Sequence, residues 1–208
     1  MTKRAKTYAR PYDRNTALEA AMRVFWLKGY HATSLKDLES ALNMKPGSIY
    51  AAFTNKEQLY RSALELYFIM GRQGFTSGLS QSTSPILWLS DYLRAIGKPS
   101  KDDAPCFSCM LTKTLMGATE QETNIAQDAR RYMDEMRAEF TRAFELAKAQ
   151  QEIPQSADTD RLALRFQSCI TVLKLEMQRG TDPNIVLSLA DDLISDLTRF
   201  EPEHSLSV

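Results

Sequence analysis

The sequence is poor in cysteine and histidine and has no long uncharged apolar run. Three cysteines, an odd number, and no apolar leader behind the charged N-terminus favour a reducing cytoplasm over secretion with disulfides. No uncharged apolar stretch approaches the roughly 18 residues of a membrane span, so a soluble chain without membrane contact is expected. Two histidines leave little for base catalysis, and neither a Ser/His/Asp set nor a carboxylate pair has supporting spacing. The sequence therefore predicts no enzyme and no cofactor.

The formal net charge is zero, but the charged residues are unevenly distributed along the chain. Residues 1–65 contain 11 Lys and Arg against 6 Asp and Glu, a balance of +5, whereas residues 66–208 contain 15 against 20, a balance of −5. Phosphates attract only the basic part, so this asymmetry favours a nucleic-acid-binding head on a separate body. Chance clustering of solvated surface charge is the alternative interpretation.

Hydrophobic spacing predicts an all-α chain, because apolar residues recur at helical intervals and no segment alternates strictly as a half-buried strand does. Gly29 is expected to stop the first helix in a left-handed conformation. Ser34 and Asp37 form a variant of the capping box at the start of the second helix, and Asn43 suits the left-handed turn after it. The helices are expected at about residues 13–29, 34–42, 46–53, 56–70, 85–96, 106–116, 124–150, 159–179 and 183–200.

The second and third helices have the size and punctuation of a helix-turn-helix, whose second helix enters the DNA major groove. Pro46 loses nothing at the first helical position, because its missing proton had no intrahelical partner. Gly47 and Ser48 are small, so the helix end and its unpaired amides can approach phosphates or base edges closely. The alternative is a three-helix packing unit with no role in DNA binding.

These residues resemble a known family. The segment GYHATSLKDLESALNMKPGSIYAAFTNKEQLY is similar to the N-terminal DNA-binding domain of the TetR/AcrR transcriptional regulators, and the resemblance covers residues 14 to about 66. It implies an all-α fold with an N-terminal three-helix helix-turn-helix domain and a larger C-terminal ligand-binding and dimerisation domain. The expected boundaries are a basic flexible arm at 1–12, the DNA-binding domain with its connecting helix at 13–70, and the effector-binding and dimerisation domain at 71–208.

The resemblance also implies which residues bind double-stranded operator DNA. It implies phosphate bonds from Thr33, Ser34, Tyr50 and Lys56. It implies that the major groove is lined by Lys45, Pro46, Gly47, Ser48 and Ala51. Ala51 and Ala52 stand where the family often has a histidine and an aromatic residue, and Asn43 stands where it usually has a turn glycine. The sequence therefore predicts that DNA is bound without indicating which operator is bound.

The last two helices are apolar on more than one face, since Leu164, Val172 and Leu175 lie off the main stripe of their helix. The resemblance implies that these two helices form a homodimer through a four-helix bundle, so that two heads read a palindromic operator. A deeply buried core helix in a monomer is the alternative.

Cys106-Phe107-Ser108-Cys109 is the most distinctive motif of the C-terminal part. Zinc would need two more ligands, and none has useful spacing, while a thioredoxin-like site would need a preceding strand. At a helix N-terminus the dipole lowers a thiol pKa, so Cys106 is the expected reactive cysteine. Some members of the resembled family carry such a cysteine and respond to oxidants or electrophiles, and some carry a lysine near it, as Lys174 is expected to be. The alternatives are a cysteine-based redox or metal-handling protein using Cys106 and Cys109, or cysteines that only fill the core.

A pocket for a small-molecule effector or oxidant is expected in the C-terminal domain, enclosed by aromatic and methionine side chains. Its expected residues are Phe75, Trp88, Tyr92, Cys106, Met110, Tyr132, Met133, Met136, Phe166 and Lys174. The sequence thus predicts a ligand- or redox-responsive transcriptional regulator, a repressor that an effector releases from its operator.

Overall fold

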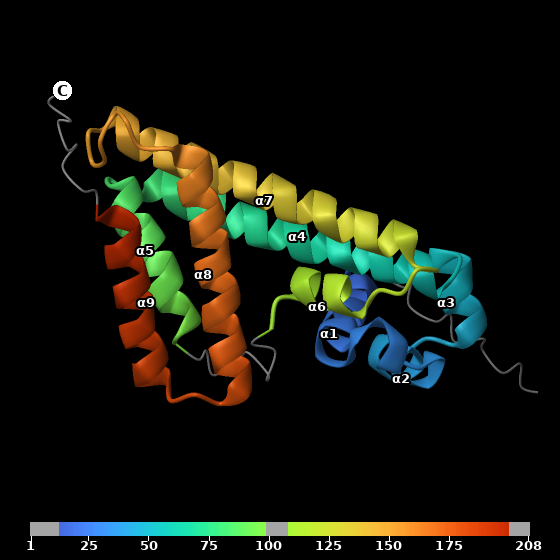
Figure 1. Cartoon of the computed structure of the whole chain (residues 1–208). Coiled ribbons are helices and arrows are strands. Elements are labelled where there is room, and N and C mark those ends of the chain that lie inside the picture. The colour runs from blue at the N-terminus through green and yellow to red at the C-terminus, as the bar shows by residue number, and fades with distance from the viewer. Residues whose placement is uncertain (1–12, 99–107, 200–208) are drawn as a thin grey trace, which may run out of the picture.

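The computed structural model describes residues 13–98 and 108–199, and these fold into nine α-helices with no strand (Figure 1). The helices are α1 Arg14–Ala32, α2 Leu35–Leu42, α3 Pro46–Phe53, α4 Lys56–Gln81, α5 Pro85–Ile96, α6 Met110–Gly117, α7 Thr123–Ala149, α8 Thr159–Arg179 and α9 Pro183–Thr198. Within these ranges the all-α prediction is confirmed. No helix of the described ranges is long and apolar enough to cross a bilayer. The expected arm at 1–12 and Cys106 lie outside the described residues.

The helix-turn-helix forms where the capping residues predict it. The Ser34 hydroxyl oxygen accepts a hydrogen bond from the Asp37 amide at 3.2 Å, and the Asp37 carboxylate accepts one from the Ser34 amide at 2.8 Å. Asn43 follows α2 with φ 50° and ψ 43°, a left-handed conformation that asparagine tolerates. Gly29, with φ 80°, interrupts α1 near its end. Local backbone preferences therefore set both turns around α2.

α4 is longer than predicted, because it continues past Met70 to Gln81. Residues 71–81, GRQGFTSGLSQ, lie between two predicted helices but are helical, and they carry Phe75 fully into the core. Gly78 provides packing space rather than a turn, since a Cβ there would overlap the Trp88 ring of α5. α4 therefore runs as one helix from the head (α1–α3) into the body (α5–α9), where it lies beside α7 (Figure 1).

Two apolar clusters fill the described part of the molecule. One joins α5, α8 and α9 to the C-terminal parts of α4 and α7. The other joins α1–α4 to α6 and to the N-terminal half of α7, where Ile125, Ala129 and Tyr132 are buried. The head thus shares a core with α6 and α7, and α6 packs against both α1 and α7. A displacement of α6 would therefore disturb the packing of the head.

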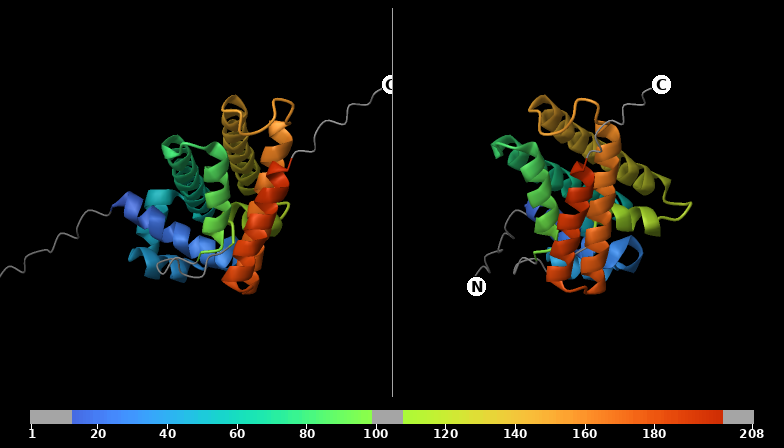
Figure 2. Two further views of the ribbon diagram at one scale, coloured as in Figure 1. Left: turned by 90° about the vertical axis from the view of Figure 1, so that its left-hand side faces the viewer. Right: turned by 60° about the vertical axis from the view of Figure 1, so that its left-hand side comes forward.

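α8 and α9 lie side by side along one side of the body (Figure 1 and Figure 2). Each helix buries one apolar stripe against the core, which in α8 includes Phe166 and Leu173. α8 also exposes Leu164, Val172 and Leu175, and α9 exposes Ile185. α8 therefore has the second apolar face that the sequence indicated, and α9 adds one exposed apolar side chain to this side of the body.

Candidate DNA-binding surface and effector cavity

α3 presents its first turn and one face to solvent. Ile49 and Phe53 are buried in the head, whereas Lys45, Gly47, Ser48, Tyr50 and Ala51 are exposed and Pro46 is half-buried. No side chain caps the N-terminus of α3, and a Cβ built on Gly47 would meet no atom within 4 Å. The Ser48 amide donates to the Lys45 carbonyl at 2.9 Å, but no side chain covers Gly47, so this end of α3 is narrow enough for close approach to a phosphate or a base edge.

The two hydroxyls before α2 are occupied within the protein. Thr33 is only 1% exposed, and its hydroxyl donates to the Gly29 carbonyl at 2.7 Å. The Ser34 hydroxyl donates to the Asp37 carboxylate at 2.7 Å. Because a hydroxyl has one proton to donate, neither residue has a hydroxyl proton left for the phosphate bond that the resemblance implies.

A shallow hollow of about 530 Å³ lies beside the turn between α3 and α4. The residues that line it are Tyr30, Tyr50, Thr54, Asn55, Lys56 and Glu57. The Lys56 ammonium stands over the Tyr30 ring, 4.6 Å from its centroid, and partial burial lowers the pKa of Lys56. Lys56 and Tyr50 thus border one concave surface next to the exposed end of α3.

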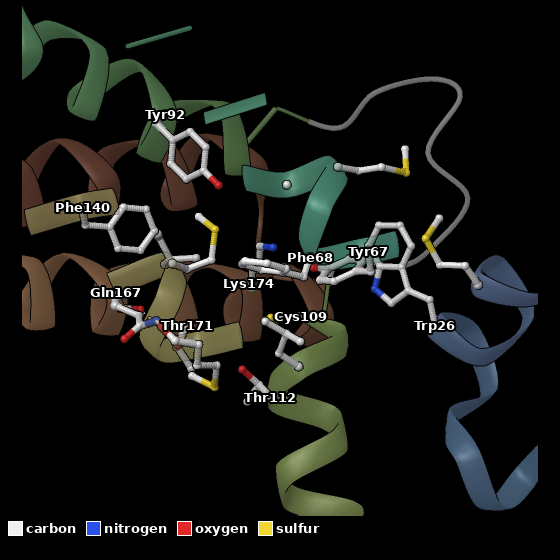
Figure 3. Close-up of a pocket in the computed structure, with 17 residues that line it drawn as sticks. Trp26, Tyr67, Phe68, Tyr92, Cys109, Thr112, Phe140, Gln167, Thr171 and Lys174 are labelled. Carbon is white, nitrogen blue, oxygen red and sulfur yellow. Dashed lines mark hydrogen bonds between the residues drawn. The ribbon is translucent and has the colours of Figure 1, made fainter. Parts of the chain in front are cut away.

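A larger cavity of about 590 Å³ lies where α1, α4, α5, α6, α7 and α8 meet (Figure 3). The residues that line it are Met22, Trp26, Tyr67, Phe68, Met70, Gly71, Tyr92, Cys109, Leu111, Thr112, Met133, Met136, Phe140, Gln167, Ile170, Thr171 and Lys174. Its volume is within the roughly 300–1,000 Å³ of ordinary small-molecule sites. The cavity is therefore the candidate effector site.

The cavity includes some of the expected effector residues and omits others. Tyr92, Met133, Met136 and Lys174 line it. The others that the structure describes pack in the core instead: Phe75 and Phe166 are fully buried, Met110 is buried beside α1, Tyr132 stacks on Phe68, and Trp88 packs on Phe75. Sequence reasoning missed Met22 and Trp26 because it assigned α1 entirely to the head. It missed Tyr67 and Phe68 because residues up to 70 were assigned to the DNA-binding domain and the effector residues were sought beyond it.

The cysteine at the start of α6 is Cys109 rather than Cys106. α6 begins at Met110, with Cys109 as its N-cap, instead of at residue 106 as predicted. Burial acts to raise the pKa of the Cys109 thiol. The Lys174 ammonium and hydrogen bonds from Thr112 lower this pKa by more than burial raises it, so the pKa lies below its usual value of 9.0. Among residues 13–98 and 108–199, no three His, Cys, Asp or Glu side chains are placed to hold a metal ion.

The start of α6 connects the cavity to α1. The Trp26 indole donates to the Ser108 carbonyl at 2.6 Å, and the Lys113 ammonium donates to the Trp26 and Leu27 carbonyls at 2.8 and 3.1 Å. Trp26 and Cys109 both line the cavity. The Trp26 bond therefore borders the cavity, and together with the Lys113 bonds it joins the start of α6 to α1.

A helix-turn-helix with an open second helix, carried on a larger helical body with a cavity, defines the class of helix-turn-helix DNA-binding regulators. The model of "Bacterial regulatory proteins, tetR family" matches residues 17–63. The HTH-type transcriptional repressor ComR of Escherichia coli strain K12 is 34% identical over 171 residues, which cover 79% of this chain and 80% of ComR. The chain therefore belongs to the TetR family of transcriptional regulators, and the predicted family and its regulatory, non-enzymatic role are confirmed.

Other relatives extend the comparison. The biofilm operon negative regulator IcaR of Staphylococcus epidermidis is 37% identical over 51 residues, 24% of this chain and 28% of IcaR. A cysteine mutant of the TetR family regulator CifR, solved with a 26 bp double-strand operator DNA, has a TM-score of 0.82 and 24% identity over 90% of this chain and 98% of CifR. A TetR family regulator from Cytophaga hutchinsonii has a TM-score of 0.76 and 21% identity over 90% of this chain and 96% of its own. These two structures share the fold.

Proposed function

We propose that the chain is a homodimeric repressor that a small molecule, bound in the cavity, releases from a palindromic operator. The composition of the cavity wall carries the proposal, because Met22 and Trp26 of the head stand in one wall with residues of the body. A ligand there touches the DNA-binding part directly. The names of ComR, a repressor, and IcaR, a negative regulator, support repression rather than activation.

The route from ligand to DNA runs through α6. A ligand that fills the cavity contacts Cys109 and Thr112 at the start of α6, and α6 is hydrogen-bonded to α1 through Trp26 and Lys113. Because α1 packs on α2, a shift of α6 reorients the helix-turn-helix. In this scheme α6 has two positions, one in which the head binds DNA and one in which it does not. The ligand releases DNA to the extent that it binds the second position more tightly than the first.

The operator is palindromic in this proposal because the regulator is a dimer. The exposed apolar side chains of α8 and α9, including Leu175 and Ile185, supply the face that pairs with a second copy. Two copies of α3 then bind half-sites about one helical turn apart, and a change in their separation prevents simultaneous docking.

Selection of bound sequences from random DNA, followed by a screen for compounds that release them, tests the proposal. The expected result is a palindromic consensus and at least one small molecule that lowers its affinity. A consensus without two-fold symmetry would contradict the dimer on DNA. Release by compounds that bind outside the cavity, mapped by Trp26→Phe and Met133→Ala variants, would contradict the assigned effector site.

Two substitutions test the assigned phosphate contacts separately. Lys56→Ala removes a charge, so the dependence of log affinity on log salt should flatten by about one unit. Tyr50→Phe removes an uncharged donor that is exposed, so affinity should fall for all sequences while the slope stays unchanged. Lys148→Ala, at the end of α7 remote from α3, is the control and should change neither quantity (Figure 1). An unchanged affinity in both test variants would contradict the contacts.

A further inference from the structure

The cavity wall carries one positive charge and no negative charge among the residues that the structure describes. Lys174 is its single charged residue, and no Asp or Glu lines it. Lys174 also forms no ion pair with any carboxylate of the described residues, whereas many other lysines and arginines on these helices pair with Asp or Glu. The ammonium therefore enters the cavity without a carboxylate partner.

The position of Lys174 favours a ligand in the cavity over a structural role. The side chain is half-buried on the inner side of α8 and reaches the space between Tyr92 of α5 and Cys109 of α6 (Figure 3). Its charge acts electrostatically on both of these groups. A cation partly removed from water is stabilised by an anion or by several hydrogen-bond acceptors, and the described wall offers hydroxyls, a thiol and the Gln167 amide but no carboxylate.

The remaining wall is apolar and bulky. It consists of the side chains of Met22, Trp26, Phe68, Met70, Leu111, Met133, Met136, Phe140 and Ile170. Such a surface binds an aromatic or branched aliphatic body, while Tyr92 supplies a hydroxyl that can donate a hydrogen bond to an anion beside Lys174.

We propose that the cavity binds an apolar organic monoanion, a carboxylate or phenolate on a hydrophobic body, with the charged group against Lys174. A cationic ligand would be repelled, a neutral one would leave the ammonium unpaired, and a dianion would find no second cation in the described wall. The inference rests on the proposed function in that it names the effector class of the same cavity. Binding of the anion can still be measured without DNA.

The anion also competes with Cys109 for the same ammonium. In the free protein Lys174 helps to keep the Cys109 pKa below its usual value. When a bound anion neutralises Lys174 and covers the thiol, Cys109 should react more slowly with iodoacetamide at pH 7. This rate is a second readout that a purely structural lysine would not produce.

Calorimetric titration of the full chain with benzoate, 2-naphthoate and octanoate, each against its neutral amide, tests the inference. We expect at least one carboxylate to bind with a dissociation constant below about 1 mM and about tenfold to a hundredfold more tightly than its amide, as a hydrogen-bonded charge pair would give. Lys174→Met should remove this preference while leaving amide binding within about threefold. Lys174→Arg should retain it, and Lys148→Met is the matched control.

Several outcomes would overturn the inference. They are amides that bind as tightly as carboxylates, a preference that survives Lys174→Met, no binding by any of the three carboxylates, or occupation only by compounds that attach covalently to Cys109. DNA release is measured separately. Carboxylates that bind but never release DNA would contradict the proposed function and leave this inference intact. Release of DNA by neutral compounds alone would support the proposed function and contradict this inference.

Discussion

Replacing Gly47 by alanine should change stability and DNA affinity in opposite directions. Gly47 lies in the first turn of α3 with an ordinary helical φ, and a Cβ there meets nothing within 4 Å. The methyl group therefore costs no packing in the free protein, and the loss of glycine's freedom in the unfolded chain should raise the free energy of unfolding by about 0.4–1 kcal/mol. Urea denaturation measures this change.

On DNA the same methyl group stands at the exposed end of α3, where close approach is expected. Displacing the helix end from a phosphate weakens hydrogen bonds to a charged acceptor, each contributing about 1.5–3 kcal/mol, so affinity should fall about tenfold to a hundredfold. Fluorescence anisotropy with a labelled operator measures this loss. Gly74→Ala is the matched control, because Gly74 is also helical, exposed and open, but lies on α4 away from α3. Equal affinity for the two variants would refute the close approach, and a destabilised Gly47→Ala would refute the open site.

Two further substitutions test the fold. Gly78→Ala should lower the free energy of unfolding by about 1–3 kcal/mol in urea, because the methyl group overlaps the Trp88 ring; an unchanged midpoint would mean that the ring is not packed there. Hydrogen bonds from Lys28, at 2.6 Å, and from Ser34 hold the pKa of Asp37 well below its usual 3.8. Because ionised Asp37 stabilises the native state above about pH 4 and that stabilisation is lost as the pH falls further, Asp37→Asn should flatten the acid side of the stability profile. Parallel profiles for wild type and variant would contradict this.

The head was predictable because its structure depends on local chemistry. The capping pair Ser34 and Asp37, the left-handed Asn43 and the helix-starting Pro46 each fix a turn from within a few residues. The candidate DNA-contact residues of α3 lie on the face that remains exposed after Ile49 and Phe53 are buried, and their contacts with DNA stay a prediction. The hydroxyl of Thr33 was harder to assign, since its bond to the Gly29 carbonyl depends on how α1 ends.

The end of α4 was not predictable, because its reason lies on another helix. A glycine-rich stretch signals a helix end only if nothing needs the space that glycine leaves. Here the Trp88 ring of α5, several residues later in the chain, occupies the space beside Gly78. From sequence alone, Gly78 is indistinguishable from Gly180, which does end a helix in the left-handed region.

A pocket was predicted, but the part of its wall that the head supplies was missed for a related reason, which also bears on mechanism. Composition divides the chain into a basic head and an acidic body, so Met22 and Trp26 were assigned to the head and the effector residues were sought only in the body. The structure joins them, because α6 packs against α1 and the Trp26 indole is bonded to Ser108. The residues that a division by composition separates are those through which ligand binding and DNA binding would be coupled. A ligand enclosed entirely by the body would act on the head indirectly, through α4, α6 or α7, whereas a ligand in the shared wall touches α1 itself.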